Sequence, residues 1–308
     1  MLGNALLVGL FSSLAFFGLG FAVGFVFGYT VIESTIIGVA MMFSSTIIGI
    51  KLLPTTVLHH RRTGELVVSL LLIQDFLAII VLLVLTGGFV EDFSGIARFG
   101  KVVLGLPLLI VFAWLFVKYV LLNILTKFDA FHEYIFLVAI GWCLGLSELA
   151  TFIGLSHEIG AFIAGVSVAT SPISIYIATN LKPLRDFFLV LFFFSLGAGF
   201  QVGLLGEIFI PAIIMAALVL LLKPIVFHGL LRSLSETDTN SWEIGFRLGQ
   251  ISEFSLLIAF IASAGHLIGE HASHLIQATA ILTFLLSSYI VVFRYPTPIG
   301  VSEKLRRD

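Results

Sequence analysis

Apolar residues occur along the chain in long blocks that are separated by short polar or turn-forming segments. Each block is close to the roughly 20 residues that a helix needs to cross the hydrocarbon core of a bilayer. The separators contain His59 to Gly64, Glu91-Asp92, Lys127 to Asp129, Lys182-Pro183, Ser235 to Ser241 and Gly269 to His271. The pattern predicts ten spans, at residues 5–28, 31–53, 65–88, 102–125, 133–153, 159–180, 186–204, 208–231, 242–265 and 272–294.

Helices and closed barrels are the two structures that satisfy the backbone inside lipid. The alternating segments of about ten residues that mark a membrane barrel are absent from the sequence. The fold class that we predict is therefore an all-α polytopic membrane protein with about ten transmembrane helices.

The distribution of lysine and arginine predicts an orientation for these spans. When the connections are numbered alternately, one set holds 13 of these residues and the other holds Arg98 and Lys101, while Lys223 lies within a span. Loops rich in lysine and arginine stay in the cytoplasm. Both termini of this chain are therefore expected to be cytoplasmic, in a cell (inner) membrane.

The same alternation gives the first three and the last three spans opposite topologies. Two three-helix units of opposite topology are typical of inverted-repeat transporters. We predict a first core repeat at 1–88, linking and scaffold helices at 102–204, a second core repeat at 208–294 and a cytoplasmic tail at 295–308. The middle span of each repeat holds small and polar residues, Ser44-Ser45-Thr46 in one and Gly249 to Glu253 in the other, which favours two broken crossing helices that line a cavity.

Composition agrees with this picture and excludes several alternatives. The 308 residues are 59% hydrophobic and 11% charged, about half the charged fraction of a soluble domain. The net charge of −2 comes without a basic patch for nucleic acid. The single cysteine, Cys143, excludes a disulfide within the chain, and the start of the chain lacks the basic region of a signal peptide.

Asp75 is the strongest candidate for chemistry, because it lies near the middle of the third span. A charged carboxyl at that depth costs about 2.5–3.5 kcal/mol on insertion scales, so such residues face a cavity or a partner. Desolvation favours the protonated carboxyl and a nearby cation favours the ionised one. One group can thus hold a proton or a cation in turn. The alternative is a buried carboxyl tied to neighbouring backbone or hydroxyl groups.

Two further charged residues lie within spans of the second repeat. Lys223 could face Asp75 across the core and compete with a cation, or its side chain could extend to the cytoplasmic interface. Glu253 could line the cavity of the ninth span or cap a half-helix. Four histidines, His157, His266, His271 and His274, are expected at the outer surface, where they could sense pH or simply be solvated. Glu158 is expected at the outer interface. No P-loop, GxSxG or HExxH pattern is present, so we predict that the protein is not an enzyme.

At these residues the chain resembles the monovalent cation:proton antiporter-2 family, and within it the Kef-type potassium/proton antiporters of the sodium/hydrogen exchanger fold. The matching stretches cover nearly the whole chain in family order, and they are Phe43 to Thr46, Ile73-Gln74-Asp75, Ile159 to Gly165, Leu191 to Gly197 and Gly249 to Phe254.

The resemblance implies roles for individual residues. Asp75 corresponds to the ion-carrying aspartate, Gln74 to the position where electrogenic relatives carry a second acid, and Lys223 to the basic residue opposite the carboxylate. The crossing-helix cavity would be lined by Ser44, Ser45, Thr46, Gln250, Ser252 and Glu253.

The chain departs from the family pattern at both ends. Family members usually carry about thirteen spans, so this chain is expected to lack the first three, and Kef-type members often continue into a nucleotide-binding regulatory domain. The full-length form is expected to be a homodimer.

The sequence thus predicts a secondary antiporter that exchanges a proton for K⁺ or Na⁺, with no cofactor and no metal beyond the transported cation. A gated cation channel and a non-transporting fragment or sensor subunit are the alternatives that the sequence leaves open.

Overall fold

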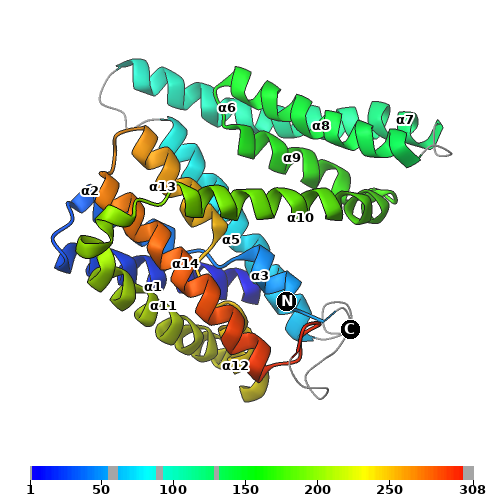
Figure 1. The fold of residues 1–308 in the computed structure, drawn as a ribbon. Coiled ribbons are helices and arrows are strands. Elements are labelled where there is room, and N and C mark those ends of the chain that lie inside the picture. The colour runs from blue at the N-terminus through cyan, green and yellow to red at the C-terminus, as the bar shows by residue number, and fades with distance from the viewer. Residues whose placement is uncertain (1, 55–61, 88–92, 128–131, 301–308) are drawn as a thin grey trace. The chain divides into compact units, whose positions relative to one another are not determined.

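The computed structural model describes residues 2–54, 62–87, 93–127 and 132–300, and every regular element within them is helical (Figure 1). The separator Glu91-Asp92, residues 59–61 of the separator His59 to Gly64 and residues 128–129 of the next separator lie outside the described residues. The predicted tail lies outside them after Gly300. By length and apolar composition, seven of the described helices could cross a membrane. The chain is therefore a multi-pass helical membrane protein.

The helices divide into two compact units, and the division falls inside one long helix. The first unit comprises Met1–Ala78 and Phe200–Asp308, and the second comprises Ile79–Gly199. The first unit contains α1 (Leu2–Val26), α2 (Val31–Met41), α3 (Thr46–Lys51), most of α5 (Arg62–Gly87), the 3₁₀ turn η2 (Val202–Leu204), α11 (Leu205–Ser233), α12 (Asp238–Arg247), α13 (Glu253–Ala264) and α14 (Glu270–Arg294).

The second unit is built around α8 and α9. It contains the end of α5, α6 (Phe93–Phe116), a π-helical turn η1 (Val117–Leu121), α7 (Leu122–Lys127), α8 (His132–Ile153), α9 (His157–Ala169) and α10 (Ser174–Ala198). Buried side chains of α6, α8 and α9 form its apolar core, with Leu109, Leu146 and Ile159 at the centre. The α6, η1 and α7 elements follow one another without a gap, and together they account for the predicted span 102–125.

Two of the ten predicted spans, 159–180 and 186–204, have other bounds in the structure, and the two predicted crossing helices are interrupted. The span predicted at 159–180 ends early, because α9 stops at Ala169 and the chain turns at residues 170–173. The separator predicted at Lys182-Pro183 is wrong, since α10 continues through Pro183 to Ala198. A proline inside an apolar helix is tolerated in membrane proteins when neighbouring groups satisfy the freed carbonyl. The span predicted at 242–265 is two helices, α12 and α13, with residues 248–252 between them.

Local sequence explains the helix boundaries that matter for the first unit. Thr30 and Glu33 form a capping box at the start of α2, which fixes where that helix begins after the turn at Gly28 (φ 83°). Ser45 caps α3 by accepting a hydrogen bond from the Ile48 amide, and Ser252 caps α13 by accepting one from the Phe254 amide. Each cap restarts a helix directly after an interruption.

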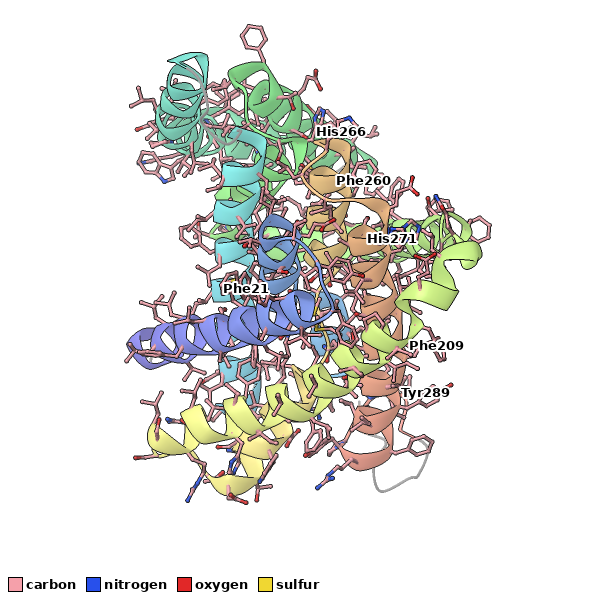
Figure 2. All side chains as sticks on the ribbon, turned by 90° about the vertical axis from the view of Figure 1, so that its left-hand side faces the viewer. Phe21, Phe209, Phe260, His266, His271 and Tyr289 are labelled. Atoms are coloured by element: carbon pink, nitrogen blue, oxygen red, sulfur yellow. The ribbon has the colours of Figure 1, made fainter. Side chains whose placement is uncertain are left out.

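The interior of the first unit joins residues that are far apart in sequence. Val8 and Phe16 of α1, Leu66 and Leu70 of α5 and Phe227 of α11 belong to one apolar cluster. Aromatic side chains such as Phe209, Phe260 and Tyr289 point outward and are 55–70% exposed, as is usual for a surface that faces lipid (Figure 2). The first unit thus has a packed core in which polar side chains are a minority.

Candidate functional site

Two helix interruptions meet inside the first unit. The first lies at residues 42–45 between α2 and α3, and the second lies at residues 248–252 between α12 and α13. The Ser44 hydroxyl donates to the Leu248 carbonyl at 2.8 Å, and the Gln250 side-chain amide donates to the Ser45 carbonyl at 3.5 Å. Non-helical backbone at membrane depth is tolerated where protein or a water-filled cavity surrounds it. Here each interruption supplies partners for the other.

Lys223 of α11 joins the two interruptions and is completely buried. Its ammonium donates to the Phe43 carbonyl at 2.6 Å, to the Gln250 carbonyl at 3.1 Å and to the Ser44 hydroxyl at 3.3 Å. These contacts use all three donors of the ammonium. The ammonium also lies 4.9 Å from the centre of the Phe16 ring, which adds a cation–π contact.

The contacts of Lys223 show which groups hold its side chain at the interruptions. Its hydrogen bonds go to backbone carbonyls and one hydroxyl, and no ion pair between Lys223 and Asp75 occurs in the described part of the chain. The reason is that each helix interruption leaves carbonyls without intrahelical partners, and a buried ammonium needs several acceptors. The side chain also does not extend to the interface, because its tip is enclosed at the interruptions.

Asp75 reaches the first interruption from α5. The Thr46 hydroxyl at the start of α3 contacts both carboxylate oxygens of Asp75, at 3.2 and 3.3 Å. The Asp75 side chain is partly buried, whereas Leu72 and Phe76 on either side of it are 57% and 60% exposed. The carboxylate therefore has one hydroxyl donor and retains lone pairs for another ligand.

Glu253 is a second carboxyl beside the first. It is the first residue of α13, lies against the Ser45 hydroxyl and the Ile47 backbone amide, and is close enough to Asp75 to interact with it electrostatically. One of its oxygens, Oε2, is buried without a hydrogen-bond partner among the described residues. The site thus combines two acidic side chains with hydroxyl groups and with the backbone carbonyls of the two interruptions.

Gln74 binds the backbone of the first interruption. Its side chain is fully buried, and its Oε1 atom accepts a hydrogen bond from the Ser44 amide at 2.9 Å. Its Nε2 atom is buried without a partner in the part of the chain that the structure describes. Gln74, which was predicted to lie beside the ion, therefore binds the backbone directly before Ser45 and Thr46.

Residues of α14 complete the site and were missed by the sequence analysis. The Ser287 hydroxyl donates to Gln250 Oε1 at 2.8 Å, and Thr283 Oγ1 accepts from the Ile251 amide at 3.4 Å. Together with Thr279, these side chains recur every four residues and are buried in an apolar helix. That i, i+4 recurrence is a signal that could have identified the face of α14 that packs on the second interruption. Ser255 was also missed, and its hydroxyl donates to the Ala40 carbonyl at the end of α2.

The remaining candidates lie away from this site or in the other unit. Glu158 and His157 belong to the second unit, where the His157 ring contacts the Thr151 hydroxyl at 3.0 Å. His266 and His271 lie near the connection between α13 and α14 and are exposed (Figure 2). His274 differs from the prediction of a solvated loop residue, because it is 7% exposed and packs on Phe200.

The polar groups of the site are oxygen ligands, which suit a hard cation. Among the described residues, no group of three or more His, Cys, Asp or Glu side chains could hold a metal ion. Carboxylate, hydroxyl and carbonyl oxygens are the ligands that hard cations prefer.

Comparison with known proteins identifies the family of the chain. Residues 1–293 match the family model described as sodium/hydrogen exchanger, transmembrane. The K(+) efflux antiporter 5 of Arabidopsis thaliana is 26% identical over 287 residues, which cover 89% of this chain and 49% of that protein. The iron transporter MagA of Paramagnetospirillum magneticum is 26% identical over 273 residues, which cover 88% of this chain and 61% of that protein.

A third relative is the ammonium/H(+) antiporter subunit AmhT of Alkalihalophilus pseudofirmus. It is 29% identical over 281 residues, which cover 89% of this chain and 70% of that protein. The chain therefore spans about half the length of the Arabidopsis antiporter and a larger share of the two bacterial proteins. The family match covers α1 to α14, including both interruptions, Asp75 and Lys223. The chain belongs to the transmembrane sodium/hydrogen exchanger family, within its monovalent cation:proton antiporter-2 branch.

Proposed function

We propose that this chain carries the ion-translocating core of a secondary antiporter that exchanges a proton for K⁺ or Na⁺. The observation that carries the proposal is Asp75, a carboxylate within an apolar helix that contacts Thr46 in an interrupted helix. An acidic side chain at that depth marks an ion or proton pathway in most membrane proteins. The relatives named for K⁺ efflux and for ammonium/H⁺ antiport support the same class of activity.

Competition for one carboxylate is the mechanism that this geometry supports. A proton neutralises Asp75, whereas an alkali cation is held by the ionised carboxylate together with the Thr46 hydroxyl. Glu253 is near enough to add negative potential, and its unpartnered oxygen is a candidate further ligand. Because the carboxylate cannot bind both ions well, the arrival of one ion releases the other.

Lys223 serves as a structural link in this proposal. Since its ammonium is held by carbonyls of both interruptions, it stays in place whether Asp75 is protonated or binds a cation. Its role is to hold the two interruptions together. The contribution of Gln74 is similar, because it binds the Ser44 amide and brings no second exchangeable charge. One proton is then exchanged for one cation.

Alternating access requires the site to open to each side in turn. We propose that the chain forms ten spans, with an inverted repeat at each end. The protein would lie in the inner membrane of the cell, with both termini of this chain in the cytoplasm. The unit formed by Met1–Ala78 and Phe200–Asp308 holds the whole site and is the candidate moving part. The unit formed by Ile79–Gly199 is the candidate scaffold, and the longer form of the protein is proposed to be a homodimer.

The experiment that tests the proposal is cation/proton exchange in proteoliposomes. An internal fluorescent pH indicator reports proton movement after pulses of K⁺, Na⁺ or Li⁺. Wild-type protein is expected to move protons in response to at least one of these ions, and Asp75→Asn is expected to abolish that response. Asp186→Asn is the matched control, since Asp186 pairs with Arg185 at the surface of the other unit.

Two outcomes would reject the proposal. Exchange by Asp75→Asn at the rate of the wild type would remove Asp75 from the mechanism. A cation conductance without proton counterflow would instead indicate the gated channel.

A further inference from the structure

Arg247 is the most deeply buried arginine in the described part of the chain and lies outside the site described above. It is the last residue of α12, directly before the second interruption, and its side chain is 1% exposed. A buried guanidinium has five donors to satisfy, so its partners indicate what it holds in place.

The partners of Arg247 come from its own helix and from two distant parts of the chain. Nη1 donates to the Leu52 carbonyl at 2.9 Å, where α3 ends, and Nη2 donates to the Pro296 carbonyl at 2.8 Å, just after α14. Nε and Nη2 donate to Glu243 Oε1 at 3.0 and 2.8 Å, which neutralises the guanidinium within α12. The planar, fork-shaped arrangement of these donors is specific to arginine.

These contacts join both interrupted helices to the segment that follows α14. α3 begins with Thr46, which contacts Asp75, and ends at the carbonyl that Arg247 binds. The second interruption begins one residue after Arg247 and contains Gln250, which contacts Lys223 and Ser45.

The segment after α14 is itself packed against this arginine. The Tyr295 ring lies 5.7 Å from the guanidinium carbon of Arg247, and the Thr297 side chain is fully buried. The neighbouring Arg294 guanidinium lies 4.9 Å from the Phe246 ring of α12. Residues 294–297 therefore contact α12 through two arginines and a backbone carbonyl.

We propose that Arg247 is a positioning residue that sets the affinity of the Asp75 site for the cation by fixing α3 relative to the second interruption, and that the segment after Tyr295 acts on the site through it. The inference rests on the proposed exchange activity. It predicts that a change just after α14 alters cation binding, although the hydrogen bonds of Asp75 within the described residues go to Thr46.

The test compares Arg247→Lys, a chain that ends after Tyr295, and the combination of the two. A lysine keeps the charge but cannot reach three separate acceptors in the plane of a guanidinium. Each single variant is expected to raise the half-saturating cation concentration about fivefold, which corresponds to one lost hydrogen bond of ordinary strength. The combination is expected to be no worse than either single variant, because the changes act through one contact.

Two controls separate this role from a general effect on folding. Arg185→Lys makes the same chemical change at an exposed ion pair and is expected to leave the half-saturating concentration unchanged. Hydrogen–deuterium exchange of residues 46–53 is expected to increase in both single variants, since α3 loses its anchor in Arg247→Lys and Arg247 loses the Pro296 carbonyl in the shortened chain. If Arg247→Lys fails to fold, Glu243→Gln takes its place, because the substitution replaces the carboxylate that orients the guanidinium with a neutral amide.

The outcomes are distinguishable from a failure of the proposed function. No exchange by the wild type under any ion pulse would reject the proposed function itself. Exchange by the wild type, together with an unchanged half-saturating concentration in the variants or with additive effects in the combination, would overturn the role of Arg247. A fall in maximal rate alone would indicate that the residue supports folding and not the position of the site.

Discussion

The two buried charges at the interruptions have separate sets of partners. Lys223 is bound by the carbonyls of Phe43 and Gln250, and Asp75 is contacted by the Thr46 hydroxyl. The cation proposed for Asp75 therefore has no lysine ammonium to displace. This separation favours a cycle in which the charge of the lysine stays constant and the carboxylate alone changes ligand.

Removal of the Lys223 ammonium is expected to destabilise the protein. In Lys223→Met, the Phe43 and Gln250 carbonyls lose a buried donor, and each unsatisfied group costs about 1–3 kcal/mol. Thermal unfolding of the purified protein in detergent should show a clearly lower midpoint than that of the wild type. Lys118→Met is the control, because Lys118 is exposed on η1 and rests over Trp114. Equal midpoints for the two variants would contradict the assignment of Lys223 as the residue that joins the interruptions.

At this scale the sequence identifies the charges better than their partners. Asp75 and Lys223 are recognisable because each is a lone charge in an apolar segment. Two acceptors of Lys223 are backbone carbonyls, which every residue carries, so they cannot be predicted from residue types. For the same reason the residues alone left two positions open for Lys223, opposite Asp75 or extending to the cytoplasmic interface.

Helix interruptions are the elements that create the site. α2 and α12 stop inside the first unit, and α3 and α13 restart from serine caps, so carbonyls and hydroxyls gather at residues 42–45 and 248–252. The sequence indicated both positions through clusters of small and polar residues. It failed at the boundary of α9 and α10, because Lys182-Pro183 resembles a loop while the turn actually follows Ala169. Proline inside an apolar helix is a weaker stop signal than in a soluble protein.

The close approach of α12 to α11 depends on Gly245. A Cβ atom at this position would lie 2.7 Å from the Pro224 carbonyl oxygen and 2.9 Å from its Cα, which are backbone atoms that cannot move aside. Gly245→Ala is therefore expected to separate the helices next to Lys223 and to destabilise the protein by about 1–3 kcal/mol. The thermal unfolding midpoint and the maximal exchange rate should both fall.

Gly229→Ala provides the comparison for Gly245. Gly229 lies on α11 with nothing within 4 Å of an added Cβ, so alanine should be neutral or stabilise the helix by up to about 1 kcal/mol. If both alanine variants unfold at the same temperature, the α11–α12 contact is not limited by Gly245.

At the scale of the whole molecule, the site lies entirely within the unit formed by Met1–Ala78 and Phe200–Asp308. The first and last parts of the chain thus build one compact body, while residues 79–199 build another. The two core repeats that the sequence predicts at 1–88 and 208–294, with their opposite topologies, remain a prediction. The sequence could not give the division inside α5, because that division depends on tertiary contacts and not on the apolar pattern of the helix.

One-for-one exchange predicts that the membrane potential has no effect on the rate. Each elementary charge moved across the membrane would contribute about 2.3 kcal/mol per 100 mV. With a single exchangeable carboxylate, and with Gln74 beside it in place of a second acid, the cycle moves no net charge. Proteoliposomes clamped at different potentials with valinomycin and K⁺ gradients, assayed with Na⁺ as the pulsed ion, should give equal initial rates. A rate that rises with an imposed potential would require a second proton, and Glu253 would be the first residue to examine.

The most direct test of the central claim is to count the protons released when the purified protein binds a cation. Calorimetric titration with K⁺ or Na⁺ in buffers of different ionisation enthalpy yields the number of protons released for each ion bound. Competition at Asp75 predicts a release that approaches one proton for each cation under conditions where the carboxyl is mainly protonated, and none from Asp75→Asn. Cation binding that releases no protons from the wild type, or equal release from Asp75→Asn, would contradict the sharing of one carboxylate between the two ions.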